Sequence, residues 1–521
     1  MISSKPIWRK INFNHGKIMV EVFYFEVIEL KCYINGYLHS MIDENHACYQ
    51  MATNDGIITH FDEDVDLSLC DEIIDLKGGH LYPGFSDAHL HMLGYGEFLS
   101  MIKLFGCDTK EDVINVLLEY KDKPFIMGLG YIDVGLTKDD LDEYFKDQIV
   151  LLRHNDYHSL TVNSKALNYF QIKDETGILK ENKAIELMNK LPKHGFKELI
   201  SFLEASIKQL YQFGITGGHT DDLFYYNGFD ETYKVFQEVL NNYPFRAHLL
   251  IHHEVVNDFL KSKLPWGVQN DYLELGSIKL FYDGTLSSKT ALMNKPYLGT
   301  NSQGEVVMGK NQFRDKLIKM RELGLTVAVH VIGDLGLDEV VDLLTLYPPK
   351  KGQRDRIIHA PWAMKKTVKK MIGLPITIDI QPQFLASDLP RVLDYLSEKP
   401  ELIFPWKTYI NHGIILSGSS DTPVEIPNPL IGIKDAVFRK SFVNQKVYEK
   451  NESLSLYEAV KLYTTNSHQS SLVSNRGYLK QGNLADFTVF NANLFKLNES
   501  DFNQVHVTMT IVSEQIVYEV S

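Results

Sequence analysis

The chain has 521 residues, of which 44% are hydrophobic and 23% charged, a balance typical of a folded protein with a large core. Its formal net charge of −14 argues against a nucleic-acid partner or an anionic membrane surface, since both require a local excess of lysine and arginine. No uncharged apolar run reaches about eighteen residues, so we expect no membrane span.

Residues 1–30 read as a leader to which we assign no role. Their apolar stretch IMVEVFYFEVIEL is interrupted by glutamates, and no small-residue cleavage site follows it as a secretory signal would require. The cysteines, which are Cys32, Cys48, Cys70 and Cys107, show neither a CxxC pair nor the density of a disulfide framework. This spacing fits a reducing, cytoplasmic location.

Both ends of the remaining chain show short alternating strands. Residues 31–81 contain CYINGYL, ACYQMA and GIITHF, separated by glycine, asparagine and aspartate, and residues 471–521 have the same character. We therefore predict a small β-sandwich assembled from the two termini.

Residues 82–424 instead alternate short β-branched runs with longer helical ones, the pattern of a parallel α/β sheet or barrel. The strand candidates number eight, which closes a (β/α)8 TIM barrel, and residues 425–470 continue it as a helical end. The candidates are YPGFSDAHLH, GITGGHT, RAHLLIHH, GSIKLFYDG, TVAVHVIGD, DRIIHAPW, ITIDIQPQF and GIILSGSSD. An insertion at about 97–206 has its own apolar periodicity, so we expect a subdomain over the barrel mouth that shapes specificity.

Polar side chains follow nearly all of these strand candidates, at the end where barrel enzymes place their chemistry. Burying such groups is costly unless they are paired or bind metal. In PGFSDAHLH the two histidines flank one leucine, so on a strand both imidazoles point to the same side and can share an ion. The residues concerned are His89, His91, His219, Lys279, Asp283, His330, Asp334, His359, Gln381 and Asp421.

In order and spacing, these motifs resemble the metal-dependent amidohydrolase superfamily, and within it the amidohydrolase-3 branch of large enzymes similar to N-substituted formamide deformylase. PGFSDAHLH, IKLFYDGTLSSKTA, HVIGD, IIHA and GSSDTPV resemble the motifs of strands one, four, five, six and eight. GYLKQGNLADFTVF resembles the closing sandwich signature.

The resemblance implies a divalent metal centre, with zinc as the expected ion and one or two ions per chain. His89, His91 and Asp421 would bind the first ion, and His330 and His359 the second. Lys279 matches the lysine that carbon dioxide converts to a bridging carboxylate in binuclear members, and its alternative role is that of a surface or salt-bridged lysine. Imidazole and carboxylate ligands suit such an ion.

The resemblance also implies hydrolysis of a non-peptide carbon–nitrogen bond, in an N-formyl or N-acyl amide, by a metal-activated hydroxide with Asp421 as general base and acid. A mononuclear deaminase or hydrolase of the same fold is one alternative. A catalytically silent binding or scaffold protein is another. The expected partner is a small-molecule amide, and a homodimer is left open.

Five residues are candidates for substrate contact. For His219 and Asp283, a capping or loop-satisfying role is an equal alternative. Tyr131 and His158 lie in the insertion and would line the pocket. Asn163 shares that expectation, with capping of the helix SKALNYF as its alternative.

Overall fold

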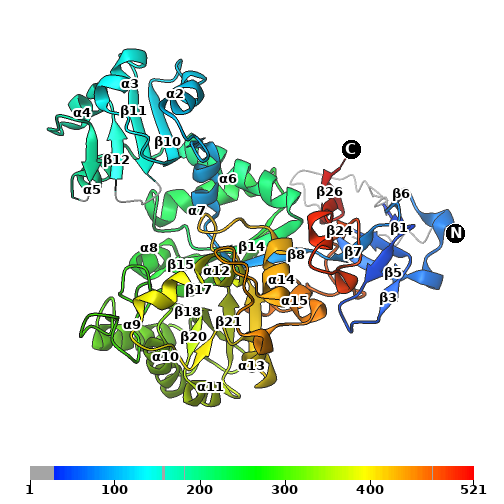
Figure 1. The fold of residues 1–521 in the computed structure, drawn as a ribbon. Coiled ribbons are helices and arrows are strands. Elements are labelled where there is room, and N and C mark those ends of the chain that lie inside the picture. Colours follow the sequence, from blue (N-terminus) through cyan, green and yellow to red (C-terminus); the bar gives the residue numbers. More distant parts are fainter. Residues whose placement is uncertain (1–28, 155–158, 181, 472, 521) are drawn as a thin grey trace, which may run out of the picture. The chain divides into compact units, whose positions relative to one another are not determined.

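The computed structural model describes residues 29–154, 159–180, 182–471 and 473–520. The expected leader, apart from its last two residues, therefore lies outside the described residues. The chain divides into two compact units, one made of residues 1–92 and 207–521 and the other of residues 93–206. Figure 1 traces both units in chain order.

A barrel of parallel strands forms the centre of the first unit, and all eight predicted strands are confirmed. Their apolar, β-branched runs are buried along almost their whole length, as expected for strands covered on both faces. In barrel order the strands are β8 (Phe85–Leu90), β14 (Ile215–Thr220), β15 (Arg246–His252), β17 (Leu273–Phe281), β18 (Val327–Val331), β19 (Asp355–His359), β21 (Ile376–Ile380) and β23 (Ile415–Gly418). The short strand β16 (Gly267–Asn270) pairs antiparallel with β17.

The first and last barrel strands meet at their carboxyl ends through backbone hydrogen bonds. The Asp421 N–H donates to the His89 carbonyl at 2.9 Å, and the His91 N–H donates to the Thr422 carbonyl at 2.9 Å. These bonds bring the segment after β23 beside the end of β8. Residues more than three hundred positions apart therefore share one site.

Helices alternate with the barrel strands and lie around the sheet in Figure 1. They are α7 (Gly228–Leu240), α8 (Val256–Ser262), α9 (Lys310–Glu322), α10 (Asp334–Leu346), α11 (Lys365–Met371), α12 (Pro382–Asp388), α13 (Trp406–Asn411), α14 (Pro429–Phe438) and α15 (Leu456–Tyr463). A two-stranded sheet, β20 (Trp362–Ala363) with β22 (Leu402–Ile403), lies among them. The start of α14 follows from its sequence, because Asn428 caps it and Pro429 occupies its first turn.

Two sheets built from both ends of the chain complete the first unit. One contains β1 (Lys31–Ile34), β4 (Met51–Asn54), β5 (Ile57–Phe61) and β6 (Glu72–Asp75). The other contains β2 (Tyr37–His39), β3 (Ala47–Cys48), β7 (His80–Pro83), β24 (Phe487–Phe490), β25 (Val507–Val512) and β26 (Gln515–Glu519). Tyr33 and Met51 of the first sheet share a core with Leu81 and Phe487 of the second.

A disulfide joins Cys32 to Cys70 in this part of the molecule, across a sequence separation of 38 residues. Cys48 and Cys107 are free and buried. Nothing in the cysteine spacing pointed to this bond. A single disulfide is not a framework, but it shows that the cysteines are not all unpaired.

The second unit is a three-layer structure around one mixed sheet. The helices α2 (Lys110–Leu118) and α3 (Lys138–Tyr144) share a core with Val150 and Leu152 of the central strand, whereas α4 (Ser164–Phe170) and α5 (Asn182–Met188) share one with Leu151. This alternation is what a strand with a helix layer on each face requires. In order, the sheet strands are β13 (Ile178–Lys180), β12 (Ser159–Val162), β11 (Ile149–His154), β10 (Phe125–Tyr131) and β9 (Ile102–Lys103). In the sequence, the helix α1 (Met92–Ser100) precedes the strands of this sheet and the helix α6 (Phe196–Gln212) follows them.

Across the described part of the chain, every helix is too short or too polar to cross a bilayer.

Candidate metal centre

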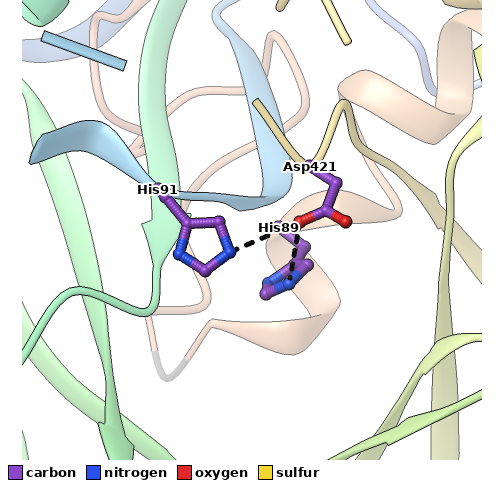
Figure 2. A group of neighbouring side chains, drawn as sticks. All are labelled: His89, His91 and Asp421. Carbon is purple, nitrogen blue, oxygen red and sulfur yellow. Dashed lines mark ion pairs between the residues drawn. The ribbon is translucent and has the colours of Figure 1, made fainter. Parts of the chain in front are cut away.

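Two histidines and one aspartate converge at the carboxyl ends of the first and last barrel strands, as Figure 2 shows. Oδ1 of Asp421 lies 3.4 Å from Nε2 of His89 and 3.4 Å from Nε2 of His91. The candidate ligand atoms of the three residues all lie within 4.8 Å of one another. Of the described residues, only these form such a cluster of histidine, cysteine and carboxylate side chains.

This spacing fits a tetrahedral ion. With metal–ligand bonds of roughly 2.0–2.2 Å, neighbouring ligand atoms of a tetrahedron lie roughly 3.3–3.6 Å apart. The two 3.4 Å separations from Asp421 fall in that range. The donors also match in type, because two imidazoles and a carboxylate suit zinc and similar divalent ions.

The local backbone is held in place by Asp87, a buried residue of β8. Its carboxylate accepts hydrogen bonds from the His89 N–H at 3.0 Å and from the Ser420 hydroxyl at 2.6 Å. Asp421 itself has a left-handed backbone with φ of 57°, a conformation that costs a non-glycine residue energy and is often found at functional sites. The backbone conformation that places this carboxylate therefore has a cost in folding stability.

His330 and His359, the predicted second pair, come from the ends of β18 and β19 and lie together. Their ring centroids are 4.6 Å apart, and the ring of His359 is 5.9 Å from that of His89. Nδ1 of His359 donates to Oε1 of Gln381 at 2.8 Å, which leaves its Nε2 as the nitrogen with a free lone pair. The structure thus brings four of the predicted histidine ligands to one end of the barrel.

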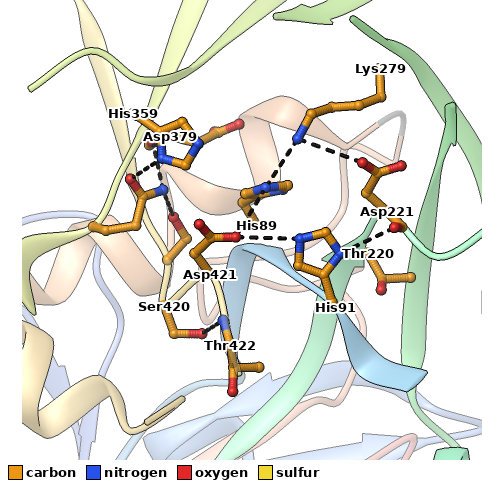
Figure 3. Close-up of polar contacts among 12 residues, drawn as sticks. His89, His91, Thr220, Asp221, Lys279, His359, Asp379, Ser420, Asp421 and Thr422 are labelled. Atoms are coloured by element: carbon orange, nitrogen blue, oxygen red, sulfur yellow. Dashed lines mark hydrogen bonds and ion pairs between the residues drawn. The ribbon is translucent and has the colours of Figure 1, made fainter. Parts of the chain in front are cut away.

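Lys279 reaches His89 of the first cluster and also Asp221, as Figure 3 shows. Its Nζ is 3.2 Å from Nε2 of His89 and 3.6 Å from Oδ2 of Asp221. Its side chain is 2% exposed. The buried amine therefore has a nitrogen of a predicted ligand, His89, and the carboxylate of Asp221 as neighbours, and the carboxylate favours the charged ammonium form.

Burial keeps most of these histidines neutral, the form that binds metal. It lowers the pKa of His359 to about 4 and, with the charge of Lys279 next to it, holds the pKa of His89 well below its usual range. Burial and the nearby His359 do the same to the pKa of His330. Burial also lowers the pKa of Lys279, against the opposing charge of Asp221.

His91 differs because it faces carboxylates. Burial alone would lower its pKa, but the hydrogen bond to Asp421 and the charge of Asp222 outweigh burial and raise the pKa to about 9. In turn the pKa of Asp421, which burial would raise, is lowered by His91 and His359. At neutral pH His91 and Asp421 therefore form an ion pair, and a cation bound to both would take the place of the proton on Nε2 of His91.

Two residues near the site were not among the predicted site residues. Besides its contact with Lys279, Asp221 accepts from Nδ1 of His91 through its carbonyl oxygen at 3.1 Å. Gln381 orients His359. The sequence did hold a signal for each, since both follow predicted barrel strands, in GGHTDD and in ITIDIQPQF.

For Asp283 the structure shows the alternative role, in which its carboxylate accepts hydrogen bonds from backbone N–H groups of nearby loops. Its carboxylate accepts the backbone N–H groups of Leu292 at 2.8 Å, Ile332 at 2.9 Å and Gly333 at 2.8 Å. His219 is buried and stacks on His248 with ring centroids 4.5 Å apart, and neither of its ring nitrogens has a hydrogen-bond partner in the described chain. Its substrate role stays a prediction.

In the second unit, Tyr131 lies in the core, and its hydroxyl oxygen accepts the N–H groups of Val134 and Leu136, both at 3.2 Å. These contacts hold the side chain within the second unit, and its role in lining the pocket stays a prediction. Asn163 caps α4 by accepting from the Ala166 N–H at 3.0 Å, the alternative role stated for it. His158 lies outside the described residues.

A (β/α)8 barrel with this donor set at the carboxyl ends of its strands defines the class of metal-dependent hydrolases. The model of the amidohydrolase family matches residues 72–518, so the chain belongs to that family, as its motifs predicted. It is an enzyme, an amidohydrolase acting on carbon–nitrogen bonds other than peptide bonds.

Individual relatives agree with this assignment. The putative amidohydrolase YtcJ of Bacillus subtilis (strain 168) is 33% identical over 527 residues, covering 93% of this chain and 99% of that protein. N-substituted formamide deformylase of Arthrobacter pascens is 24% identical over 254 residues, or 47% of this chain and 46% of that protein. The crystal structure of an uncharacterized metal-dependent hydrolase from Pyrococcus furiosus gives a TM-score of 0.78 at 25% identity, covering 90% of this chain and 100% of that one.

Proposed function

We propose that this protein hydrolyses a small non-peptide amide, of the N-formyl or N-acyl type, at a zinc centre held by His89, His91 and Asp421. The observation that carries the proposal is that Oδ1 of Asp421 lies 3.4 Å from Nε2 of both His89 and His91 at the barrel end, a separation that fits a tetrahedral ion. The similarity to a formamide deformylase over about half of each chain supports the choice of amide.

We further propose that a second ion is held by His330 and His359, and that Lys279, once carboxylated, joins the two sites. A lysine reacts with carbon dioxide only as the neutral amine, and burial favours that form. Bound zinc supplies a hydroxide nucleophile at neutral pH by lowering the pKa of water.

Asp421 is the residue that moves the proton. It lies at the centre of the ligand cluster and keeps a lowered pKa, so it starts as the acceptor for a proton from the attacking water. It then passes that proton to the departing amine nitrogen. His91 stays hydrogen-bonded to Asp421 and to the Asp221 carbonyl, which fixes the ring between the two.

Aromatic rings beside the histidines favour a substrate with an apolar substituent. Within the first unit, Tyr225 packs edge-on to His91 with centroids 5.8 Å apart, and Phe281 lies 5.3 Å from His330. Phe384 stacks on His359 at 6.1 Å. Tyr225 is 48% exposed and its neighbour Phe224 is 41% exposed in the described chain, which leaves apolar surface for a ligand.

A single-ion hydrolase or deaminase is the second candidate function. It is favoured by the fact that, among the described side chains, only His89, His91 and Asp421 already sit at ligand spacing. In that case Lys279 would remain an amine paired with Asp221. The third alternative, a silent scaffold, would give no turnover at all.

The test is a turnover screen of N-formyl and N-acyl arylalkylamines with zinc-loaded protein, reading both products by mass spectrometry. The proposal expects amine and carboxylate in equal amounts, lost in Asp421→Asn and kept in Asp230→Asn, which alters an exposed residue. Ammonia release from amino-substituted rings instead would support the deaminase. No turnover across both panels would contradict the proposed substrates.

A further inference from the structure

His252, the last residue of β15, ends a barrel strand on the same side of the barrel as the candidate metal centre. Its Cα pairs with that of Lys279 across the parallel strands β15 and β17. Directly paired residues of neighbouring strands project their side chains to the same face of a sheet, and Lys279 projects to the face that holds His89. The side chain of His252 therefore lies in the barrel mouth, on the face of the metal ligands.

Two aromatic rings connect His252 with the predicted ligands. The ring centroid of Tyr225 is 5.4 Å from that of His252 and 5.8 Å from that of His91. The ring centroid of Phe281 is 5.5 Å from that of His252 and 5.3 Å from that of His330. A single aromatic ring thus separates His252 from a predicted ligand of each proposed ion, a span that a small bound molecule can cover.

Packing fixes the orientation of the His252 ring. Phe224 stacks on it with centroids 4.4 Å apart and an interplanar angle of 11°, and His253 stacks on it at 4.6 Å and 27°. At one edge of the ring, Nδ1 accepts the backbone N–H of Glu254 at 3.2 Å. These contacts hold the imidazole in one position and leave its Nε2 edge for another partner.

Nε2 of His252 is a hydrogen-bond donor that a ligand can reach. A neutral imidazole carries one proton, and because Nδ1 accepts from Glu254, that proton is on Nε2. Burial lowers the pKa of His252 to about 3, with the charges of His253 and Lys279 adding to the shift, so the ring is neutral at physiological pH. No described residue accepts from Nε2, yet this atom is open to solvent, unlike the sealed and unpaired ring nitrogens of His219.

We propose that His252 is a specificity-determining residue, which donates from Nε2 to an acceptor oxygen on the substituent of the substrate while the reacting amide lies at the metal centre. The inference rests on the proposed function, because it assigns a substrate feature to that same site. A substrate that covered this donor without an acceptor would leave it unpaired, which costs binding free energy. Phe224 and Tyr225, which are 41% and 48% exposed, would pack against the apolar part of the substituent. The favoured substrate thus carries both an apolar group and a carbonyl or carboxylate oxygen.

The experiment compares three racemic or achiral amides that share a phenylethyl group. N-formylphenethylamine has no acceptor beside that group, N-formylphenylalanine has a carboxylate there, and N-formylphenylalanine amide has a carboxamide. Calorimetry measures their binding to the zinc-loaded full chain, and steady-state kinetics measure kcat and KM. The proposal expects the wild type to bind at least one acceptor-bearing amide about tenfold or more tightly than N-formylphenethylamine. The two acceptor arms show which oxygen the site takes.

Two variants of His252 separate a substrate contact from a structural role. Asparagine places its oxygen near the position of Nδ1 and is a common capping residue, so His252→Asn keeps the bond to Glu254 but loses the Nε2 donor. Glutamine places its amide nitrogen near the position of Nε2, so His252→Gln keeps a donor but loses that bond. The proposal expects the preference to vanish in His252→Asn, through a higher KM at similar kcat, and to survive in His252→Gln. His506→Asn, which alters an exposed histidine, is the control and should bind as the wild type does.

The opposite order would overturn the proposal, because a role confined to capping Glu254 leaves His252→Asn unchanged and harms His252→Gln. The same preference in the wild type and His252→Asn, or no preference in the wild type, would overturn it as well. His252→Phe covers the case in which His252→Asn does not fold, since phenylalanine keeps a ring against Phe224 but has no donor, and it should also lose the preference. Turnover of the amides without a preference would contradict this inference alone, whereas a preference in binding without turnover would contradict the proposed function alone.

Discussion

Nζ of Lys279 lies 3.2 Å from Nε2 of His89, inside the barrel and with both side chains buried. An ammonium at this place would repel any ion bound to His89, whereas a carboxylate on the same nitrogen would attract it. Whether Lys279 is an ammonium or a carboxylate should therefore affect how many ions the site binds. It is also the contact that separates the binuclear proposal from the mononuclear one.

Gln381 should act through His359. Replacing it in Gln381→Leu removes the acceptor at 2.8 Å from Nδ1 of His359, so the ring loses the bond that fixes its tautomer and orientation. We expect the affinity of the second metal site and kcat/KM to fall by about 10–100-fold, as is typical for such outer partners. Metal titration and steady-state kinetics on the same preparation measure both.

The matched control is Gln383→Leu. Gln383 lies two residues further on, inside α12, and is also buried, but its amide donates to the Ile426 carbonyl at 2.9 Å and not to a predicted ligand. It should lower stability without changing the metal affinity of the second site. Equal losses of metal affinity in the two variants would rule out a positioning role for Gln381.

The contribution of Asp435 to the free energy of unfolding should become less favourable as the pH rises. Burial raises its carboxyl pKa to about 8, with Glu425 adding to the shift and Lys434 opposing it. The unfolded value is about 3.9, so between these two pH values the folded state holds more protons and the free energy of unfolding falls with rising pH. In Asp435→Asn this contribution is absent.

Tm measured at several pH values tests this. The advantage of Asp435→Asn over the wild type should grow from pH 4 to pH 8 and then stay constant, because the wild-type carboxyl is ionised in both states above that point. Asp122→Asn, an exposed substitution, serves as the control and should follow the wild type. A constant difference across the whole range would show that Asp435 does not titrate as the burial implies.

The cysteines should divide into two bonded and two free. Denatured but unreduced protein should give two reactive thiols per chain, from Cys48 and Cys107, and reduced protein should give four. Closing a 38-residue loop stabilises a fold by about 3–4 kcal/mol in the chain-entropy model, so reduction should lower Tm. Four thiols before reduction would contradict the Cys32–Cys70 bond.

The barrel was predictable because its signal is local and repeated. Each barrel strand is a short β-branched run followed by a polar residue, and the helix pattern between strands is distinct, so the eight strands could be counted. The tight HxH motif placed His89 and His91 on one side of a strand end. The order of motifs then placed Asp421 with them, although more than three hundred residues intervene.

What the sequence could not reveal depends on contacts between distant segments. The ion pair of Lys279 with Asp221, and the support that Gln381 gives His359, form only when neighbouring barrel strands align their ends. The backbone N–H groups of Val134 and Leu136 that bond to the hydroxyl of Tyr131 could not be predicted either. The Cys32–Cys70 bond likewise links strands and turns that no spacing rule connects.

The most direct test of the central claim is the metal content of wild type and Lys279→Ala, purified without chelators and measured by elemental mass spectrometry. We predict close to two zinc ions per chain in the wild type and a sharp fall in the variant. About one ion in both proteins would contradict the bridging role of Lys279 and favour the mononuclear mechanism. The absence of tightly held metal from the wild type would contradict the metal centre of His89, His91 and Asp421 itself.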